Sequence, residues 1–459
     1  MVKKNDQVVV TIEDIGADGE GIGKQEGYTL FIKDTVVGDK VLAKVMKTGK
    51  TYGYARLVEL IEPSDSRVSP RCPIADKCGG CQLMHMDYGK QLEYKENKVR
   101  SCLTRIGGFT DIPMEAICGM DEPYYYRNKS QFPVGRNKEG KLTIGFYAGR
   151  THSIIDTEHC YIGAEVNTAI LKFLRGFLET HGIEPYEEET HKGLLRHILT
   201  RVGFQTGEIM VCLVINGKDF PHKGELVEGL RKLPGMKSIC LNINTSKTNV
   251  ILGDKVIPVW GEPYITDSIG PISYRISPLS FYQVNPEQTK KLYDITLEYA
   301  GLNGTEVVWD LYCGIGTISL FLAQRAKQVY GVEIIPQAIE DAKKNAELNG
   351  ITNAEFYVGA AEEVLPRKYR EEKLKADIIV VDPPRKGCDQ SLLDTILMMS
   401  PKKVVYVSCD PATLARDLKY LCEKDYELIK VRPVDQFGHS VHVETVALLH
   451  NKKLLEFNK

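Results

Sequence analysis

The feature that most constrains this chain is a regular alternation of short apolar strands and helical stretches, which begins near residue 285. The predicted strands are Val307–Leu311, Val329–Glu333, Glu355–Val358, Asp377–Asp382 and Val404–Ser408. Such a series predicts a mostly parallel sheet with helices on both faces. Two further strands, Glu427–Pro433 and His442–Leu449, flank a turn-rich link and are expected to close the sheet as an antiparallel hairpin.

A helix is predicted just ahead of this series. Asn285 offers a capping side chain, Pro286 suits the first helical position, and an apolar stripe runs on to Gly301. The alternating region is therefore expected to begin with a helix.

The carboxyl ends of the predicted strands carry most of the polar and reactive residues. Ligands of open α/β sheets bind at that edge. The residues found there are the segment Asp310-Leu-Tyr-Cys-Gly-Ile-Gly-Thr317, Glu333, the segment Asp382-Pro-Pro-Arg385 and the segment Ser408-Cys-Asp-Pro411, while the hairpin returns Glu444 to the same edge. One cleft is thus predicted to collect a glycine-rich turn, several carboxylates and a thiol.

The glycine-rich turn and the acid after the next strand predict a nucleoside ligand. Gly314 and Gly316 form the turn, and Glu333 is placed to accept hydrogen bonds from both hydroxyls of a ribose. Ser319 stands where the dinucleotide fingerprint has a third glycine, and the lysine of a P-loop is missing. S-adenosylmethionine, a nucleoside without phosphates, therefore fits better than NAD or ATP.

Cys409 precedes a predicted helix that has Asp410 as its cap and Pro411 in its first turn. The field of a helix amino terminus favours the thiolate, although by less than about one pKa unit at an exposed terminus. A cysteine taken alone is more often a small buried hydrophobe. Its neighbours at the sheet edge favour a nucleophile instead, activated mainly by contacts formed with the substrate.

A thiol beside a methyl donor suggests methylation of a pyrimidine at C5. This carbon is a poor nucleophile until a thiolate adds at C6 and converts the ring to an enolate. A base must then remove the C5 proton, and Glu444 is the candidate.

The motif Asp382-Pro-Pro-Arg385 separates rival chemistries. Enzymes that methylate adenine amino groups typically have an aromatic residue where Arg385 stands. RNA cytosine-C5 enzymes usually carry a cysteine inside the motif, where this chain has Pro383 and Pro384. Uracil C5 is the remaining target.

Residues 1–60 alternate short strands with glycine-rich turns and predict a small β-barrel. A strip from Lys40 to Val58 combines five cations with Tyr52 and Tyr54 and has no carboxylate. It suits binding to a phosphate backbone with stacking on bases, but a solvated barrel face is an equally good interpretation.

Three cysteines, Cys72, Cys78 and Cys81, lie close together around Gly79 and Gly80 and predict a metal site. Cys160 is the preferred fourth ligand, over Cys102 and Cys118. Four thiolates suit either zinc or an iron-sulfur cluster, and their spacing does not decide between the two.

The size and composition of the chain limit the number of its domains and the kinds of partner it can bind. Its 459 residues predict about three domains, and a net charge of -2 restricts nucleic-acid binding to local patches. No apolar run is long enough to span a membrane, and the acidic residues near the start argue against a signal peptide. We expect a cytoplasmic protein whose twelve cysteines are not explained by disulfides.

Taken together, these residues resemble the RNA uracil-C5 methyltransferase family, in particular its 23S ribosomal RNA branch with an amino-terminal TRAM domain. The most specific motifs are Asp382-Pro-Pro-Arg-Lys-Gly387, Val407-Ser-Cys-Asp-Pro-Ala-Thr413 and His442-Val-Glu-Thr445. The resemblance implies an OB-like TRAM barrel over 1–60, a central α+β domain over 61–274 and a Rossmann-like class I methyltransferase domain over 275–459.

The resemblance also implies roles for individual residues. Cys409 is the expected nucleophile and Glu444 the expected base. Contacts with S-adenosylmethionine are expected from Gln283, Tyr312, Gly314, Gly316, Glu333 and Asp382, and ligation of a [4Fe-4S] cluster from Cys72, Cys78, Cys81 and Cys160. Thr317 departs from the Asn that some members have, which puts a donor contact there in doubt.

The expected partner is 23S ribosomal RNA, because the transfer RNA branch looks different in lacking both TRAM and the cysteine cluster. No protein partner or membrane is expected, and the chain is expected to be a monomer. Two alternatives stay open: methylation of transfer RNA, and a noncatalytic RNA-binding or remodelling protein on a methyltransferase scaffold.

Overall fold

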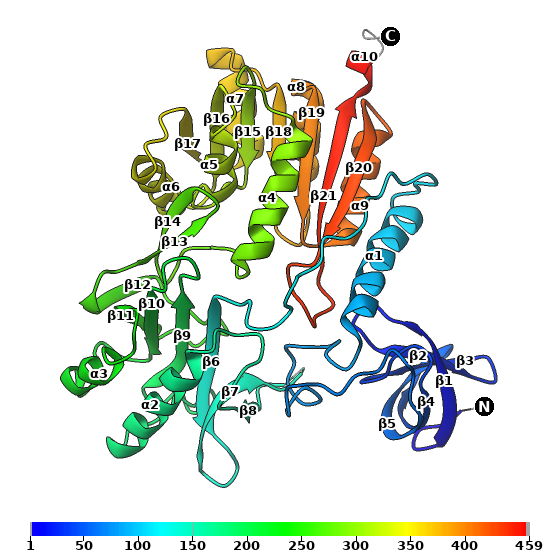
Figure 1. Ribbon diagram of the computed structural model, residues 1–459, viewed down its shortest axis with the longest axis vertical. Coiled ribbons are helices and arrows are strands. Elements are labelled where there is room, and N and C mark those ends of the chain that lie inside the picture. The colour runs from blue at the N-terminus through cyan, green and yellow to red at the C-terminus, as the bar shows by residue number, and fades with distance from the viewer. Residues whose placement is uncertain (1, 150, 456–459) are drawn as a thin grey trace. The chain divides into compact units, whose positions relative to one another are not determined.

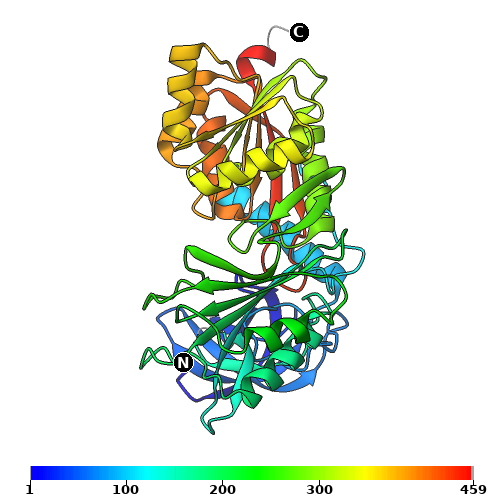
Figure 2. The same ribbon diagram turned by 90° about the vertical axis from the view of Figure 1, so that its left-hand side faces the viewer.

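The computed structural model describes residues 2–149 and 151–455, drawn in Figures 1 and 2. The chain divides into two compact units. The first unit holds the chain up to Lys98 together with two short segments, Phe146–Ile155 and Phe437–His442. The second unit holds the remainder. Helix α1 (Tyr88–Arg105) begins in the first unit, and its residues from Val99 onward belong to the second.

The first unit contains the predicted barrel. Its five strands close in the order β1-β2-β3-β5-β4 (Figure 1). They are β1 (Gln7–Ile15), β2 (Gly21–Gln25), β3 (Tyr28–Ile32), β4 (Lys40–Thr48) and β5 (Tyr52–Glu62). A core of alternating apolar residues, including Val10, Leu30 and Val41, fills the interior. The predicted small barrel is therefore confirmed.

Strand β2 begins within the glycine-rich segment 17–23, which the sequence predicts to be one of the turns between the barrel strands. It pairs antiparallel with β1 and β3. A Cβ atom at Gly21 would lie 2.0 Å from Oγ1 of Thr35, and one at Gly23 would lie 2.9 Å from the carbonyl oxygen of Thr11. These glycines allow close packing inside the barrel and do not mark a turn.

The second unit contains most of a central sheet with the order β12-β11-β10-β9-β6-β7-β8. Its strands are β6 (Lys129–Arg136), β7 (Leu142–Tyr147), β8 (Ile154–Asp156), β9 (Leu195–Val202), β10 (Ile209–Ile215), β11 (Met236–Ile243) and β12 (Lys255–Gly261). Helices α2 (Asn167–Thr180) and α3 (Lys223–Leu230) accompany it. Strands β10 and β11 are parallel, whereas the pairs β6–β9, β9–β10 and β11–β12 are antiparallel.

The carboxyl-terminal sheet has the order β17-β16-β15-β18-β19-β21-β20. Its strands are β15 (Val307–Leu311), β16 (Gln328–Glu333), β17 (Ala354–Val358), β18 (Ile378–Val381), β19 (Lys403–Ser408), β20 (Tyr426–Val434) and β21 (Glu444–Asn451). The first five are parallel, and β21 and β20 close the edge antiparallel. Both the parallel series and the closing hairpin are confirmed.

Helices cover both faces of this sheet (Figure 2). They are α4 (Pro286–Ala300), α5 (Thr317–Ala323), α6 (Pro336–Leu348), α7 (Ala361–Glu372), α8 (Gln390–Met399) and α9 (Pro411–Cys422), followed by a short α10 (Lys452–Leu455). One core joins Val308 and Val380 to α4, α5, α6 and the hairpin of β13 (Ile265–Ile269) and β14 (Ile272–Ile276). The other core joins Trp309 and Ile379 to α7, α8, α9 and the end of α1.

Helix α4 has the predicted caps. The side chain of Asn285 accepts a hydrogen bond from the backbone N–H of Gln288, Pro286 opens the helix, and Gly301 ends it in the left-handed conformation. In the part of the chain that the structure describes, no helix is long and apolar enough to cross a membrane.

Candidate active site

The predicted site residues of the carboxyl-terminal sheet lie at one edge, within the second unit. Strand β21 runs antiparallel to β19 with Ser408 opposite Thr445, so Glu444 begins its strand beside the point where β19 reaches Cys409. The charges of Glu444 and Asp382 both act on the Cys409 thiol. The sheet therefore brings together the thiol and two of the predicted carboxyl groups.

Cys409 is half-buried directly ahead of α9. As predicted, Asp410 caps that helix and accepts hydrogen bonds from the N–H groups of Ala412 (2.9 Å) and Thr413 (3.0 Å). Burial, then Glu444 and Asp382, raise the pKa of the Cys409 thiol to about 12, and Arg385 opposes them. Burial and the two carboxyl groups outweigh the helix field, whose effect was predicted to be less than about one pKa unit, so the helix alone does not ionise the thiol in this state.

The carboxyl groups around the thiol are also perturbed. Glu444 is only 3% exposed, and burial, followed by the charge of Asp382, raises its pKa to about 8 against the opposing effect of Arg385. Burial likewise raises the pKa values of Asp382 and Asp310 to about 7. These groups exchange protons near neutral pH, as general bases and acids do.

A buried carboxylate that sequence reasoning missed, Asp417 of α9, holds the loop after β18. It accepts hydrogen bonds from the Tyr406 hydroxyl (2.7 Å) and the Cys388 backbone N–H (2.8 Å). Oδ1 of the same carboxylate accepts a hydrogen bond from Nε of Arg416 (2.7 Å). This fixes the loop that carries Arg385 against the helix that follows Cys409. In the sequence, Asp417 stands as a single acidic residue on the apolar face of α9, between Leu414 and Leu421, and this position could have indicated a buried carboxylate.

The turn after β15 adopts the expected tight conformation. Tyr312, Gly314 and Gly316 all have positive φ angles. A Cβ atom at Gly316 would lie 3.2 Å from Cβ of Ala342 and 3.2 Å from the Phe356 ring, so the close approach of the turn requires glycine there. The Tyr293 hydroxyl donates to Oγ1 of Thr317 at 2.9 Å and holds the start of α5.

Glu333 ends β16 and holds this turn from the other side. Its Oε2 accepts a hydrogen bond from the N–H of Gly314 (3.3 Å), and its Oε1 accepts one from the N–H of Ile335 (3.0 Å). Each oxygen retains a lone pair for a further donor. The carboxylate therefore suits the pair of hydroxyls on a ribose.

Three exposed apolar residues surround Glu333, and sequence reasoning missed them. Ile334 is 66% exposed and Ile335 56% exposed. Val358, opposite Glu333 on β17, is also exposed. Such a surface suits the flat face of a nucleobase. Its only signal in the sequence was that apolar residues continue past the strand ends.

Gln283 precedes α4 and is buried, with 8% of its surface exposed. Its carbonyl oxygen accepts a hydrogen bond from Nδ2 of Asn128 (3.0 Å), and Arg201 donates to the carbonyl oxygen of Ser280. Phe281 of the same segment is 70% exposed. The central sheet thus holds a segment that presents an aromatic ring to solvent.

Three cations gather on the central sheet next to that segment. Lys129 of β6 lies opposite Arg201 of β9, and Arg127 donates through Nε to the carbonyl oxygen of Lys129. Burial, then Arg201 and Arg127, lower the pKa of Lys129 to about 7. Nε of Arg201 is buried and has no hydrogen-bond partner among the described residues. Such a cluster suits an anionic ligand.

The predicted metal ligands fall in different parts of the fold. Cys72, Cys78 and Cys81 belong to one loop of the first unit and are half-buried, and Cys160 belongs to the second unit. Gly79 and Gly80 suit a tight wrap, because a Cβ atom at Gly79 would lie 3.2 Å from Cα of Gly149. One at Gly80 would lie 3.5 Å from Sγ of Cys78. The loop and its three sulfur donors fit a thiolate-bound metal or cluster.

The predicted cation and aromatic strip lies on the barrel surface. Tyr52 and Tyr54 are exposed, and their rings lie 5.9 Å apart and within 5.7 Å of the Phe31 ring. Lys47 pairs opposite Tyr54 and is also exposed. The aromatic and cationic side chains of the strip are therefore open to a partner.

Comparison with known proteins adds independent findings. A family model described as tRNA (Uracil-5-)-methyltransferase matches residues 259–452, and a TRAM domain model matches residues 2–58. An uncharacterized RNA methyltransferase of Halalkalibacterium halodurans is 54% identical over 452 residues, covering 98% of each chain. One from Clostridium tetani is 50% identical over 449 residues, covering 98% of this chain and 97% of its own.

Among solved structures, the chain is similar to the Pyrococcus abyssi tRNA (uracil-54, C5)-methyltransferase in complex with S-adenosyl-L-homocysteine. The TM-score is 0.78 at 29% sequence identity, and the match covers 96% of this chain and 100% of the other. That transfer RNA enzyme therefore shares nearly the whole architecture, so the architecture does not separate the two RNA classes.

Proposed function

Because this chain belongs to the TRAM-containing RNA uracil-5-methyltransferase family and is an S-adenosylmethionine-dependent enzyme acting on RNA, we propose that it methylates C5 of a uridine in 23S ribosomal RNA through a covalent adduct with Cys409. The observation that carries the proposal is the convergence of the Cys409 thiol with Glu444 and Asp382 at one sheet edge. S-adenosylmethionine supplies the methyl group as an electrophile.

Cys409 performs the first step. Its sulfur, after losing its proton, bonds to C6 of uracil, and the ring becomes an enolate with negative charge at C5. C5 then takes the methyl group as the bond from that group to the donor sulfur breaks. Because burial and two carboxyl groups raise the pKa of the thiol, its ionisation is expected to accompany binding of the base.

Glu444 performs the second step. Its carboxylate takes the proton from C5, the bond between C6 and the Cys409 sulfur breaks, and the double bond of the pyrimidine returns. A pKa of about 8 gives this carboxylate more basic strength than an exposed glutamate has.

Substitution of Cys409 tests the first step. Cys409→Ala is expected to abolish methyl transfer from labelled S-adenosylmethionine to RNA while RNA binding persists. Cys422→Ala, which changes a half-buried cysteine at the far end of α9, is the matched control and should retain activity. Full activity of Cys409→Ala would contradict the mechanism.

Substitution of Glu444 tests the second step. Glu444→Gln should trap the enzyme on RNA as a complex that survives denaturing gels, because the C5 proton can no longer leave. Glu423→Gln changes an exposed carboxylate directly after α9, at the end of that helix far from Cys409. This control variant should release its product normally. Absence of a trapped complex would assign the base role to another group.

We propose that the methyl donor is bound by Gln283, Tyr312, Gly314, Gly316, Glu333 and Asp382. The hydrogen bonds that Glu333 accepts from the N–H groups of Gly314 and Ile335 support this, as does the exposed apolar surface of Ile334 and Ile335. Glu333→Gln is expected to weaken binding of S-adenosylhomocysteine by roughly tenfold or more, since hydrogen bonds to a charged acceptor contribute about 1.5 to 3 kcal/mol. Unchanged affinity would remove Glu333 from the site.

RNA binding is proposed at two places, one in each unit. The first is the barrel surface of Tyr52, Tyr54 and Lys47, where stacking contributes about 1 to 3 kcal/mol per base. The second is the cationic cluster of Arg127 and Lys129 in the second unit. Tyr54→Ala should weaken RNA binding with little change in its salt dependence, whereas Lys129→Gln should reduce that dependence.

The choice of RNA is decided by fractionating the labelled product. Support for ribosomal RNA comes from the resemblance of the three-cysteine loop to that branch. The TRAM barrel does not discriminate, because the match to a transfer RNA enzyme extends over 96% of this chain. A specific observation favours transfer RNA as the second candidate, since the transfer RNA enzyme of Pyrococcus abyssi matches 96% of this chain. Mapping 5-methyluridine in ribosomal RNA with and without the protein would also identify the target uridine. Label confined to transfer RNA would overturn the first choice.

We propose that Cys72, Cys78, Cys81 and Cys160 bind a [4Fe-4S] cluster that organises the central region, with zinc as the alternative. The half-buried thiols and the two glycines of the loop support the ligand set. An absorption band near ~400 nm that bleaches with dithionite would indicate the cluster. A colourless protein with one zinc per four thiols would establish zinc instead.

The domain limits of 1–60, 61–274 and 275–459 are likewise proposed. Limited proteolysis tests them. Because residue 61 lies inside β5 and residue 275 inside β14, cleavage is expected in the loops that follow these strands, after Glu62 and after Ile276.

A further inference from the structure

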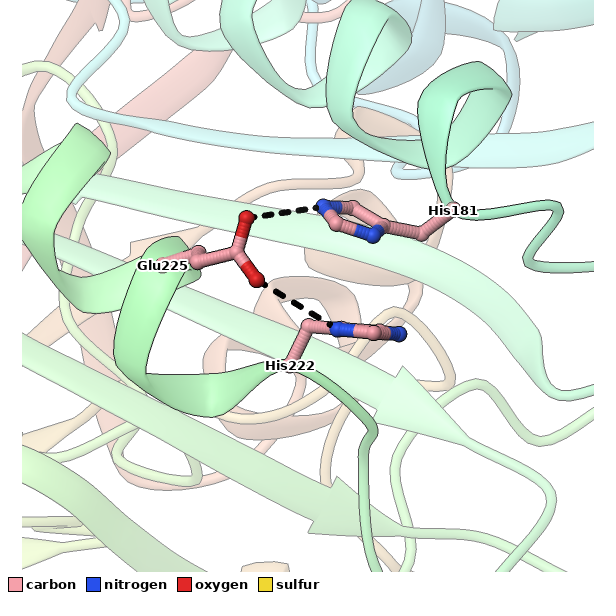
Figure 3. Close-up of side chains that lie close together, drawn as sticks. All are labelled: His181, His222 and Glu225. Atoms are coloured by element: carbon pink, nitrogen blue, oxygen red, sulfur yellow. Dashed lines mark ion pairs between the residues drawn. The ribbon is translucent and has the colours of Figure 1, made fainter.

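Two histidines and a glutamate come together in the second unit, where α2 ends and α3 begins. None of the three belongs to the methyl-donor, RNA or cysteine sites proposed above. His181 caps the carboxyl end of α2, His222 caps the amino end of α3, and Glu225 lies in the first turn of α3. Figure 3 shows both imidazole rings directed toward the carboxylate. Their three ligand atoms all lie within 4.8 Å of one another.

The spacing of these atoms suits a bound ion better than direct hydrogen bonds. Nε2 of His181 and Nδ1 of His222 each lie 3.4 Å from an oxygen of Glu225. Hydrogen bonds between nitrogen and oxygen are usually about 2.7 to 3.2 Å long. Ligand atoms about 2.0 to 2.1 Å from a tetrahedral zinc ion are separated by roughly 3.4 Å, close to each of these two distances, in which Oε2 faces His181 and Oε1 faces His222.

The surroundings hold the ligands in place. The two imidazoles stack with their centroids 4.0 Å apart, and the ring of Phe177 packs on His181 at 4.5 Å. His222 has a left-handed backbone with φ of 54°, which is uncommon for a residue other than glycine. Lys223, the nearest cation in sequence, pairs with Asp219 at 2.7 Å and leaves Glu225 to the histidines.

We propose that His181, His222 and Glu225 form a binding site for a divalent transition-metal ion of the zinc class. Two imidazoles and one carboxylate are ligands that zinc accepts, and water completes a fourth position in zinc sites with three protein ligands. Because the ligands come from the end of α2 and the start of α3, the ion joins these two helices. It also stabilises the region by mass action.

The test is a Zn²⁺ titration of the purified full chain, with the metal proposed for the cysteine loop quantified beforehand, followed by competition with a chromogenic chelator. The wild type is expected to bind one more equivalent of Zn²⁺ than His222→Gln or Glu225→Gln, or to bind it at least tenfold more tightly. Glu228→Gln is the matched control, because Glu228 is an exposed carboxylate one turn along the same helix. It should behave as the wild type.

Zinc K-edge absorption of the added ion identifies its ligands. Nitrogen and oxygen neighbours in the wild type that disappear in both variants support the site. Exposed positions such as His222 and Glu225 tolerate substitution, and circular dichroism confirms that the variants fold. Equal zinc binding by wild type and variants, loss of binding in Glu228→Gln, or a sulfur-only environment for the added ion would overturn the proposal.

Discussion

Two deeply buried carboxyl groups, Asp39 in the first unit and Glu444 in the second, have opposite electrostatic properties. Asp39 is 0% exposed and Glu444 is 3% exposed. Burial favours the protonated form of both. Yet the pKa of Asp39 lies below its usual value, whereas that of Glu444 is raised to about 8.

The difference comes from the partners. Burial raises the pKa of Asp39, but hydrogen bonds from the Arg67 side chain and from the N–H groups of Ser64 and Val36 outweigh it. Glu444 has the repulsive charge of Asp382 beside it and only Arg385 acting in the opposite direction. A buried carboxylate whose oxygens all accept hydrogen bonds from a cation and from backbone N–H groups stabilises the fold. A buried carboxylate that lacks such donors is available for proton transfer.

Asp39→Asn gives the largest expected loss of stability. Removing one member of a buried ion pair costs about 3 to 5 kcal/mol, because Arg67 would keep its charge without a counterion. Differential scanning calorimetry should show a lower unfolding temperature for the transition of the barrel. Glu59→Gln, at an exposed site on β5, is the control and should leave the transition in place. An unchanged unfolding temperature in Asp39→Asn would mean that the ion pair with Arg67 does not stabilise the fold, and Asp39 would then not differ from Glu444 in this respect.

Glu444→Gln should be more stable than the wild type, by about 1 to 3 kcal/mol at pH 9, because it removes a buried charge that has no complete set of partners. This is the opposite of the loss expected for Asp39→Asn. The pKa of Glu444 is raised in the folded protein, so folding favours the protonated form. Its favourable contribution is present below the ordinary value of 4.5 and is lost as pH rises towards about 8.

The measurement is thermal unfolding of wild type and Glu444→Gln at pH 6 and pH 9. The advantage of the variant should grow with pH. Glu427→Gln, at an exposed position on β20, should show no such trend. A variant that is less stable than the wild type at pH 9 would mean that partners other than those described stabilise the carboxylate.

The pH dependence of methylation sharpens the comparison further. If Glu444 must be ionised in the free enzyme, kcat/KM should rise by about tenfold per pH unit below pH 7 and level off above about pH 8. Steady-state rates at saturating methyl donor and limiting RNA measure this. A profile that is already flat at pH 6 would contradict a base with a raised pKa.

Tyr406→Phe gives the smallest expected effect, because it removes one of several hydrogen bonds to Asp417. The loss of stability should be about 1 kcal/mol, with a modest fall in methylation as the loop that carries Arg385 loosens. Denaturant unfolding and initial rates check the two parts. Tyr420→Phe, which removes a hydroxyl of α9 that donates to Asp394 and not to Asp417, should leave methylation unchanged.

Local patterns predicted the carboxyl-terminal sheet well. The apolar strands, the caps of α4 and the capping role of Asp410 are each determined by residues close together in sequence. The convergence of Cys409 and Glu444 followed from the general rule about strand ends. The sheet edge at which these residues meet was therefore predictable from the strand ends, whereas the roles of the individual residues came from the family resemblance and stay predictions.

Features that depend on distant residues could not be predicted. The glycines of β2 were interpreted as part of a turn. Gly21 is needed instead because the side chain of Thr35, which follows β3, packs directly against it, and that contact is not apparent from the local sequence. The pKa of Cys409 depends first on burial, which the sequence does not show, and then on two carboxyl groups that the sequence placed in the same cleft without indicating their effect on the thiol. Asp417 was missed because its partners come from β19 and a loop.

The high pKa of Cys409 has a consequence for the enzyme at rest. Peroxides and alkylating agents attack thiolates, and at neutral pH a thiol with a pKa of about 12 is almost entirely protonated. If Cys409 is the nucleophile, as proposed, its sulfur is therefore protected from these reagents until a substrate binds. Burial and the two neighbouring carboxyl groups would then protect the same sulfur atom that the reaction needs.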